Sequence, residues 1–391
     1  MKFTILQQDL LPPLQTVVRS TGIRSTLPIL ENILFTTEGS KVRLSATNLE
    51  IGVIKFVPAQ IQEPGEIVVP AKTILEVVTS LKEPKIDIST NQNSLIVSAG
   101  KFQATISAGS SSEFPVIPVG GGEGISLPKN MLNSCAQILY AAATDEGRPT
   151  LTGVLTQSSA GKLDFVATDG FRLAHRQIQL ALSPLTSFDK SQDKSFDKSQ
   201  DKPLGINSVK GFRSLIPKKT LEEVLKIISE EGVDEVVIKD ISSQNQIIFH
   251  IGETIISSRL IEGQFPSWEK IIPTQIQTTA IINKEQMLVA VKLAAVFAKN
   301  EANIIVLKLE KDKMVLSSSA KELGSQQNEI EADVSGDGLT IAFNARFLID
   351  AISNAPSSKI TLNFSGSLSA CLIRPVGVEG LEYILMPVKL S

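Results

Sequence analysis

Three positively charged residues occupy the same position in three copies of a short cassette. The copies are PAKTILEVV (70–78), PKKTLEEVL (217–225) and NARFLIDAI (344–352). In register, Lys72, Lys219 and Arg346 each stand two residues after a cap-like residue, at the start of a stretch with helical apolar spacing. A cation repeated in three similar units would form a symmetric basic surface, which is typical of a protein that contacts a polyanion.

The same cassettes allow a simpler interpretation. Each cation is followed four residues later by an acid, giving the pairs Lys72/Glu76, Lys219/Glu223 and Arg346/Asp350. Such pairs on a solvated helix stabilise it by only about 0.2–0.5 kcal/mol each. Surface ion pairs and a polyanion-binding face are both open alternatives at this point.

A second candidate site is Asp169, in the segment Thr-Asp-Gly-Phe-Arg-Leu. Together with Asp145 or Glu146 it could serve a metal-dependent hydrolase. Such a site needs a cluster of ligands, and the two histidines, His175 and His250, have no visible partner in the sequence. Asp-Gly is more typical of a tight turn between two strands. We therefore expect no catalytic residue, no metal site and no cofactor.

Bulk composition narrows the class of partner. The chain has 391 residues and a formal net charge of −3, so binding to nucleic acid must come from local patches. Its two cysteines, Cys135 and Cys371, lack metal-ligand spacing and fit a reducing cytosol. The N-terminal residues do not resemble a signal peptide, and no apolar stretch reaches the roughly 18 residues that span a membrane. We expect a cytoplasmic protein without a membrane partner.

The cassettes also define the domain organisation. Their cations are 147 and 127 residues apart (219 − 72 and 346 − 219), and the larger gap contains the tandem octapeptide SFDKSQDK. Without those 16 residues the two gaps nearly agree, so we interpret the octapeptides as an insertion into a threefold repeat. The predicted domains are 1–122, 123–273 (with the insert at about 186–203) and 274–391, with boundaries at a glycine run and near a proline.

Each domain is predicted to contain two helices packed on antiparallel strands, an α+β architecture. A first strand (2–6, 124–127 or 279–282) leads into a helix, and alternating strands and the cassette helix follow. In the first domain, Asp9 is the expected N-cap, with Pro12 and Pro13 in the first helical turn. In the second, the helix is expected to bury Leu132, Cys135, Ala136 and Leu139.

Several sequence segments of the repeat resemble those of a known family. TLPILENI (26–33), ATNLE (46–50), VATDGFRLA (166–174) and the ending MPVKL (386–390) are similar to the bacterial sliding clamps, the beta subunits of DNA polymerase III. The resemblance covers the whole chain apart from the octapeptides. It implies a ring-shaped, head-to-tail dimer of three-domain subunits whose helices surround duplex DNA. It also implies a processivity factor without catalytic activity.

The resemblance assigns two sets of residues. It implies contacts with DNA, without sequence preference, for Arg24, Lys72, Arg148, Lys218, Lys219, Lys284, Lys292 and Arg346. It implies a hydrophobic pocket for partner peptides, lined by Leu151, Thr168, Gly170, Phe171, Arg172, Leu173, Pro266, Lys270, Ile271, Ala345, Arg346, Ile384, Leu385, Met386, Pro387 and Val388. Phe171 replaces a histidine that many relatives carry, a difference that could change peptide preference.

The dimer seam is expected to join an edge strand of the first domain to a helix and strand of the third. The candidates are Lys101, Ala104, Ile106, Val296, Phe297, Glu329 and Glu331. The implied partners are duplex DNA, a second copy of the chain, a clamp loader, the replicative polymerase and other proteins with a clamp-binding motif. The alternative of another class is a dimeric scaffold that binds peptides but does not encircle DNA.

Overall fold

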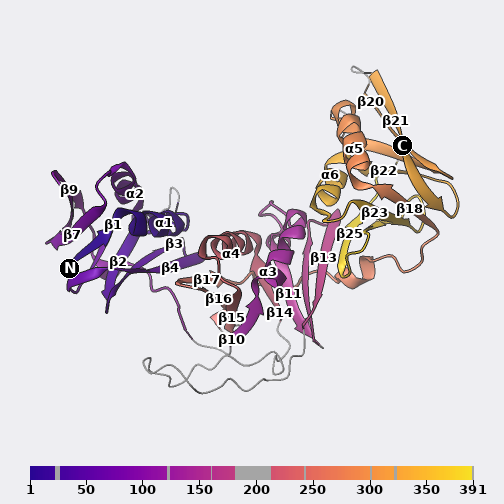
Figure 1. Cartoon of the computed structure of the whole chain (residues 1–391). Helices are drawn as coiled ribbons and strands as arrows, with labels where there is room; N and C mark the ends of the chain where they lie inside the picture. Colours follow the sequence, from indigo (N-terminus) through magenta and orange to yellow (C-terminus); the bar gives the residue numbers. More distant parts are fainter. Residues whose placement is uncertain are drawn as a thin grey trace. The chain divides into compact units, whose positions relative to one another are not determined.

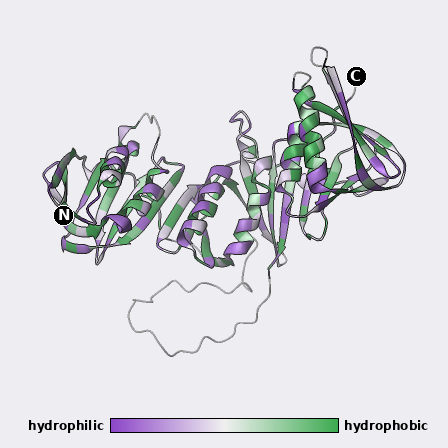
Figure 2. Cartoon of the chain, turned by 45° about the horizontal axis from the view of Figure 1, so that its top comes forward, coloured by the Kyte–Doolittle hydropathy of each residue, from purple (hydrophilic) through white to green (hydrophobic). Residues whose placement is uncertain are grey.

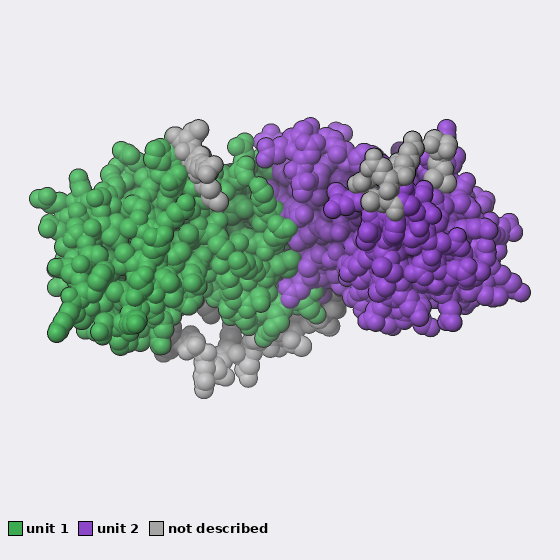
Figure 3. All heavy atoms as spheres, turned by 90° about the horizontal axis from the view of Figure 1, so that it is seen from above, with its two compact units in different colours: residues 1–130, 183–208, 219–260 green, residues 131–182, 209–218, 261–391 purple. Residues whose placement is uncertain are grey.

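The computed structural model describes residues 1–22, 27–120, 124–159, 161–180, 213–241, 244–299, 302–320 and 324–389. Its contacts divide the chain into two compact units, coloured separately in Figure 3. Unit 1 contains 1–130, 183–208 and 219–260, and unit 2 contains 131–182, 209–218 and 261–391. The middle third of the chain therefore contributes to both units. The predicted octapeptide insert lies outside the described residues.

Unit 1 contains two antiparallel sheets. The first has the order β5 (Gln60–Glu63), β1 (Lys2–Leu6), β7 (Lys85–Asn91), β8 (Ser94–Ala99) and β9 (Phe102–Ser107). The second has the order β10 (Gly124–Pro128), β15 (Glu235–Ile241), β16 (Gln246–Ile251), β17 (Thr254–Arg259), β4 (Ile51–Pro58), β3 (Lys41–Thr47), β2 (Asn32–Glu38) and β6 (Glu66–Pro70). Pairing of β4 with β17 makes one sheet from two consecutive repeats, as Figure 1 shows.

Helices α1 (Gln7–Val18), α2 (Ala71–Ser80) and α4 (Lys218–Glu231) carry apolar residues at helical spacing. In α1 and α2 these residues include Leu10, Leu14, Ile74 and Val78, which are fully buried. The predicted start of α1 was wrong. The helix begins directly after β1, without a side-chain cap, so Asp9 lies in its first turn and Pro12 and Pro13 lie inside it. There the Thr16 hydroxyl donates to the carbonyl oxygen of Pro12 at 3.2 Å.

The strands of unit 2 form one continuous sheet. It runs β14 (Arg213–Pro217), β11 (Gly153–Ser159), β12 (Lys162–Thr168), β13 (Arg172–Gln179), β25 (Leu381–Leu385), β24 (Cys371–Pro375), β23 (Lys359–Phe364), β18 (Thr278–Asn283), β21 (Gly324–Ser335), β20 (Lys313–Ala320), β19 (Ile304–Glu310) and β22 (Leu339–Asn344). Here β13 and β25 join two consecutive repeats, as β4 and β17 do in unit 1.

The helices of unit 2 are α3 (Lys129–Asn133), α5 (Lys284–Ala298) and α6 (Ala345–Asn354). The single helix predicted around Leu132–Leu139 was wrong, because α3 is followed by two short 3₁₀ turns. The Ser134 hydroxyl donates to the Met131 carbonyl at 2.6 Å, a local bond that competes with regular helix. The three-residue period of a 3₁₀ turn then buries Ile138, and Ala136 is exposed.

No helix among the described residues is long and apolar enough to cross a membrane.

Candidate nucleic-acid and peptide interfaces

The three repeated cations occupy equivalent places at helix starts. Lys72, Lys219 and Arg346 are the second residues of α2, α4 and α6, and all three are exposed. The first backbone N–H groups of a helix have no partner within it and favour anions. Each exposed cation therefore stands beside a second positive feature, the amino end of its own helix.

The acids of the cassettes do not neutralise these cations. In the described structure, none of the three cations pairs with the acid four residues later. Glu223 instead accepts a charged hydrogen bond from Arg19 of α1, at 2.7 Å. Asp350 pairs with Arg172 of β13, at 2.5 Å. The interpretation of the cassettes as three internal ion pairs is thus not supported by the geometry.

The remaining predicted DNA-contacting cations differ in their surroundings. Lys292 and Arg148 are exposed, and Lys218 is half-buried. The Lys284 amine donates to the carbonyl oxygen of Ala355 at 2.6 Å, so it caps the end of α6. Arg24 lies outside the described residues.

Asp169 and Asp145 have structural roles. One Asp169 oxygen accepts the N–H groups of Phe171 and Arg172 at 2.9 and 3.0 Å, and the other accepts from the Arg172 guanidinium at 3.0 Å. Asp145 accepts the N–H of Gly147 at 2.9 Å. Both acids close tight turns, as predicted for Asp169, and the described residues contain no group of acids, histidines or cysteines placed to bind a metal ion.

The same turn occurs in unit 1 with different side chains. Asn48 accepts the N–H groups of Glu50 and Ile51 at 3.0 and 2.8 Å, as Asp169 does in its copy. The carbonyl of Glu50 accepts from Arg259, and that of Phe171 from Met386, at 2.9 and 3.0 Å. One backbone framework therefore supports an acid in unit 1 and an aromatic ring in unit 2.

Arg172 is the centre of the candidate peptide site. Its guanidinium pairs with Asp169 and Asp350 and donates to the carbonyl of Tyr140 at 3.1 Å. It also lies over the rings of Tyr140 and Phe347, at 5.2 and 4.6 Å from their centres. Burial, and then the neighbouring Tyr383, raise the pKa of Tyr140 well above its usual value, so its ring remains a neutral platform.

The residues of the predicted pocket divide into a base and a rim, which we call the C-terminal apolar site. The base is buried and comprises Leu151, Thr168, Leu173, Ala345, Ile384 and Leu385. The rim contains exposed Gly170, Phe171, Pro266, Lys270, Ile271, Arg346 and Met386, with half-buried Arg172, Pro387 and Val388. Phe171 is 57% exposed and stacks on Phe347 of α6, with ring centres 6.2 Å apart. A large aromatic ring exposed in this way is typical of a recognition surface.

Sequence reasoning missed three aromatic residues of this site. Phe347 and Tyr140 flank Arg172, and Trp268 packs beneath the site with Leu173 and Ile384. Phe347 follows the repeated cation directly, but Lys72 and Lys219 are followed by threonine at that position. This break in the repeat was a signal that could have identified it.

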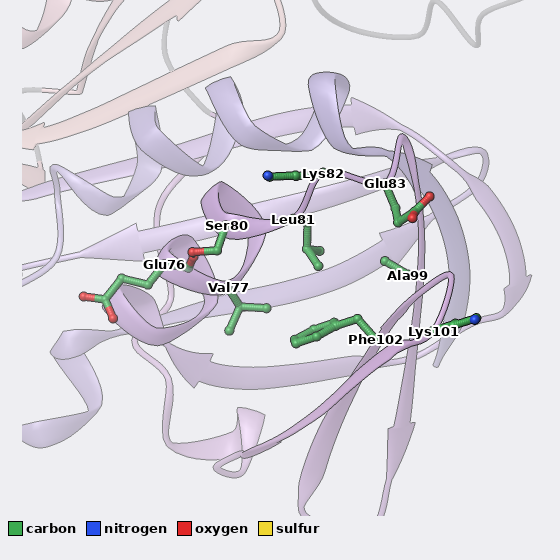
Figure 4. A pocket seen from close by; sticks show the side chains of 9 residues that line it. All are labelled: Glu76, Val77, Ser80, Leu81, Lys82, Glu83, Ala99, Lys101 and Phe102. Carbon is green, nitrogen blue, oxygen red and sulfur yellow. The ribbon is translucent and has the colours of Figure 1, made fainter.

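The residues of the predicted seam lie at the edge strand β9 of unit 1 and on α5 and β21 of unit 2. In unit 1, Lys101 and Phe102 are exposed at β9, where a groove also contains Val77 and Leu81, as Figure 4 shows. Ile106 is only 6% exposed and its side chain belongs to the core of unit 1. Ala104 is half-buried on the same strand. Phe102 is 43% exposed and was not among the predicted seam residues.

In unit 2, the seam candidates line α5 and β21. Val296 is 61% exposed, Phe297 is half-buried, and Glu329 and Glu331 are exposed. Val289 and Leu293 continue the exposed apolar stripe along α5, which is green over much of its length in Figure 2. The described residues thus leave an apolar helix face without a cover.

Comparisons with known proteins agree with this architecture. Three models of the DNA polymerase III beta subunit match the chain. The N-terminal domain model matches residues 1–118, the central domain model 126–186 and 202–267, and the C-terminal domain model 269–389. The chain belongs to the DNA polymerase III beta subunit family. It has the three clamp domains of that family, and its function is that of a DNA sliding clamp, a processivity factor without catalytic activity.

Relatives of full length support the same assignment. The beta sliding clamps of Synechocystis sp. and Bacillus subtilis are each 28% identical to the chain, with complete coverage of both sequences. A crystal structure of the sliding clamp from Pseudomonas aeruginosa with ligand has a TM-score of 0.89 at 27% identity, and it covers both chains completely. A second structure of that clamp, bound to griselimycin, has a TM-score of 0.88 at 27% identity with the same coverage.

Proposed function

We propose that the chain closes as a head-to-tail homodimer that encircles duplex DNA and tethers the replicative polymerase to it. Its domains are proposed to be 1–122, 123–273 and 274–391. The observation that carries the ring is that consecutive repeats are already joined twice by the same strand pairing, β4 with β17 and β13 with β25. A third seam of this kind would join the ends of two chains and close the ring.

The strand equivalent to β17 in the first repeat is β9. Each follows a hairpin glycine with positive φ, Gly252 for β17 and Gly100 for β9. Thr254 and Phe102 are the second residues after those glycines, so they are equivalent. β17 pairs with β4, but β9 is the last strand of its sheet and pairs only with β8. This edge is therefore available to a partner chain.

The strand equivalent to β4 in the third repeat is the first part of β21. Ala46 and Ser318 are each the sixth residue of their strands, β3 and β20, so they are equivalent. Ala46 pairs with Val53 and Ser318 pairs with Gln326, so Val53 and Gln326 are equivalent too. Within unit 2, the only residues of β21 that pair with β18 are 332–335. The earlier residues of β21 therefore pair with β20 on one side and have an unpaired edge on the other.

These equivalences set the register of the proposed seam. In unit 1, Thr254 pairs with Lys55 and Ile256 with Val53. Phe102 should therefore pair with Asn328 of the partner subunit, and Ala104 with Gln326 of the partner subunit. One step further out, Lys101 would stand opposite Glu329 of the partner subunit, a complementary pair of charges.

The seam is tested by substitution of its exposed aromatic residue. Phe102→Glu should convert the dimer, twice 42.1 kDa, into a 42.1 kDa monomer in sedimentation at micromolar concentration. Leu49→Glu, also exposed but away from both edges, is the matched control and should leave the dimer intact. A wild-type protein that is monomeric or trimeric would disprove the arrangement.

The proposed DNA-binding surface is formed by cations at helix starts. Lys72, Lys219 and Arg346 are exposed, equivalent and free of their cassette acids, so they can approach phosphates without reading bases. The triple change of these residues to Glu should weaken retention on circular DNA equally for all sequences and reduce the salt dependence of binding. Unchanged retention at low salt would favour a peptide-binding scaffold that does not encircle DNA.

The C-terminal apolar site is the proposed tether. Its exposed Phe171, Met386 and Ile271 over a buried apolar base suit a peptide with apolar and aromatic anchors. Because the Pseudomonas aeruginosa clamp has been solved bound to griselimycin, we propose griselimycin as a ligand of this chain, to be tested as a competitor of such peptides. We propose the polymerase, a clamp loader and other proteins with such anchors as partners. Because these partners act on the chromosome, we place the protein in the cytoplasm.

A further inference from the structure

The chain's only tryptophan lies against a buried histidine. The rings of Trp268 and His175 have centres 4.4 Å apart at an angle of 46°. Trp268 is 5% exposed and His175 is 6% exposed. The other histidine, His250, lies on β16 in unit 1. A buried imidazole in contact with one indole is a group whose charge state can be observed directly.

His175 stands between carboxylates on the two strands that flank its own. Its Nε2 atom is 2.9 Å from Asp164 on β12, and its Nδ1 atom is 3.5 Å from Glu382 on β25. Gln177 donates to the same Asp164 oxygen at 2.9 Å. Arg374 of β24 donates to Glu382 at 2.9 Å. Since β13 and β25 come from consecutive repeats, the histidine connects the two repeats within unit 2.

The His175 Nε2 atom is hydrogen-bonded to Asp164, whereas the buried Nδ1 atom faces Glu382 at 3.5 Å without a hydrogen bond, an arrangement in which a proton on each nitrogen is favoured by a nearby carboxylate. A neutral imidazole has one N–H and can donate to one carboxylate, whereas an imidazolium has two. Burial acts to lower the pKa of His175, but the hydrogen bonds and charges of Asp164 and Glu382 outweigh it and raise the pKa. The bond from His175 lowers the pKa of Glu382. Burial acts to raise the pKa of Asp164, but the hydrogen bonds from His175 and Gln177 together outweigh it and lower that pKa.

The same elements build the C-terminal apolar site. β25 ends in Ile384 and Leu385, which belong to the base of the site. Trp268 begins the short turn that carries Lys270 and Ile271 of the rim. Trp268 and Ile384 also share one apolar cluster. A change in the bonds of His175 therefore reaches the base through β25 and the rim through the Trp268 ring.

We propose that His175 is a pH-dependent latch that joins β12 to β25 and sets the geometry of the C-terminal apolar site. As an imidazolium it pairs with both carboxylates. When it loses its proton, the pairing of His175 with one of the two carboxylates is lost and the hold on β25 and the Trp268 turn weakens. The pKa is raised, so the latch is fully closed below the ordinary histidine value of about 6.5 and opens as pH rises through the higher folded value. The effect on peptides rests on the proposed tethering function.

The first test needs no peptide. A protonated imidazole quenches an adjacent indole, so tryptophan fluorescence of the full-length protein should increase with pH, with a midpoint above about 6.5. His175→Gln should abolish the transition, and the matched control His250→Gln should retain it. Proton NMR of the two histidine rings in the wild type should give the same midpoint without a variant. A midpoint at or below the ordinary value, or a transition that persists in His175→Gln, overturns the latch.

The second test measures the consequence for binding. A fluorescein-labelled peptide with leucine and phenylalanine anchors is titrated at about pH 6 and about pH 8.5, on either side of the expected transition. The wild type should bind at least about three-fold more weakly at the higher pH, and His175→Gln should bind equally at both. Equal wild-type binding at both pH values, with the fluorescence transition present, overturns the coupling to the site. Absence of binding at every pH instead overturns the proposed peptide function, while the fluorescence test still decides the protonation of His175.

Discussion

Leu49 and Gly170 hold the same place in two copies of one turn, but only glycine suits the backbone there. Their φ angles are 74° and 91°, in the region that residues with a side chain rarely adopt. We expect Gly170→Ala to lower the free energy of unfolding by about 1 kcal/mol. Leu49→Gly should cost nothing or add up to about 1 kcal/mol, because relieved strain offsets the entropy of glycine. Urea unfolding measures both, and a loss of more than about 1 kcal/mol in Leu49→Gly would contradict the equivalence.

The planar shape of the Arg172 side chain, and not only its positive charge, determines its contacts. Its planar guanidinium bonds two acids and a carbonyl and lies over two rings, a set of contacts that an ammonium cannot reproduce. Arg172→Lys should lower the free energy of unfolding by about 2 kcal/mol and weaken peptide binding. The matched control is Arg346→Lys, at an exposed position, which should leave stability unchanged. Equal stability of the two variants would show that only the charge of Arg172 matters.

At the scale of the helix, α1 and α5 carry different residues at the equivalent position that faces the next repeat. Arg19 and Val296 are each the thirteenth residue counted from the start of their helix, Gln7 and Lys284. Arg19 bonds Glu223 and Glu230 at 2.7 and 2.9 Å within unit 1. The residue of the first repeat that corresponds to Glu223 is Glu76, 147 positions earlier (223 − 147), whereas Glu230 has no counterpart on α2, which ends at Ser80. The proposed seam between chains would thus have valine at the position where the junction of the first two repeats in unit 1 has an ion pair.

Val296→Arg should therefore tighten the dimer. The new guanidinium would reach Glu76 of the partner subunit, and the dissociation constant should fall by roughly ten-fold, equivalent to about 1.4 kcal/mol. The gain should disappear at high salt, and Val296→Gln is the uncharged control. Sedimentation equilibrium at two salt concentrations measures the effect. A weaker dimer at low salt would show that the two helix positions are not equivalent.

The regular elements could be predicted from the sequence because their apolar period is undisturbed. β1, β12 and the cassette helices appear where expected, with Ile74, Leu221 and Leu348 buried. The errors arose where local hydrogen bonding overrides the period, as Ser134 does after α3. Phe347 and Trp268 could not be placed in the site by spacing, since only the fold brings them beside Arg172 and beneath Leu173.

At the scale of the whole molecule, deletion of the C-terminal segment should affect peptide binding without affecting the proposed dimer. The N–H of Val388 donates to the carbonyl of Ala342 at 2.8 Å, so Pro387, Val388 and Lys389 should form one wall of the apolar site at the start of the last five residues, 387–391. Their deletion should weaken peptide binding by about 2 kcal/mol or more, measured by fluorescence anisotropy. The dimer should survive, because the segment is part of neither proposed seam strand, β9 or β21, and sedimentation of the same variant checks this. Affinity within a few-fold of wild type would contradict the assignment of the pocket.

The two internal seams have a consequence for the origin and engineering of the molecule. β4 meets β17 and β13 meets β25 through equivalent residues, so each repeat ends in the same pair of complementary edges. A single-repeat ancestor with those edges could close only on copies of itself, as a six-membered homo-oligomer. Fusion of three copies would then convert two of every three contacts between molecules into covalent linkage. By the same logic, two present chains joined end to end by a linker would form a ring with a single point of opening.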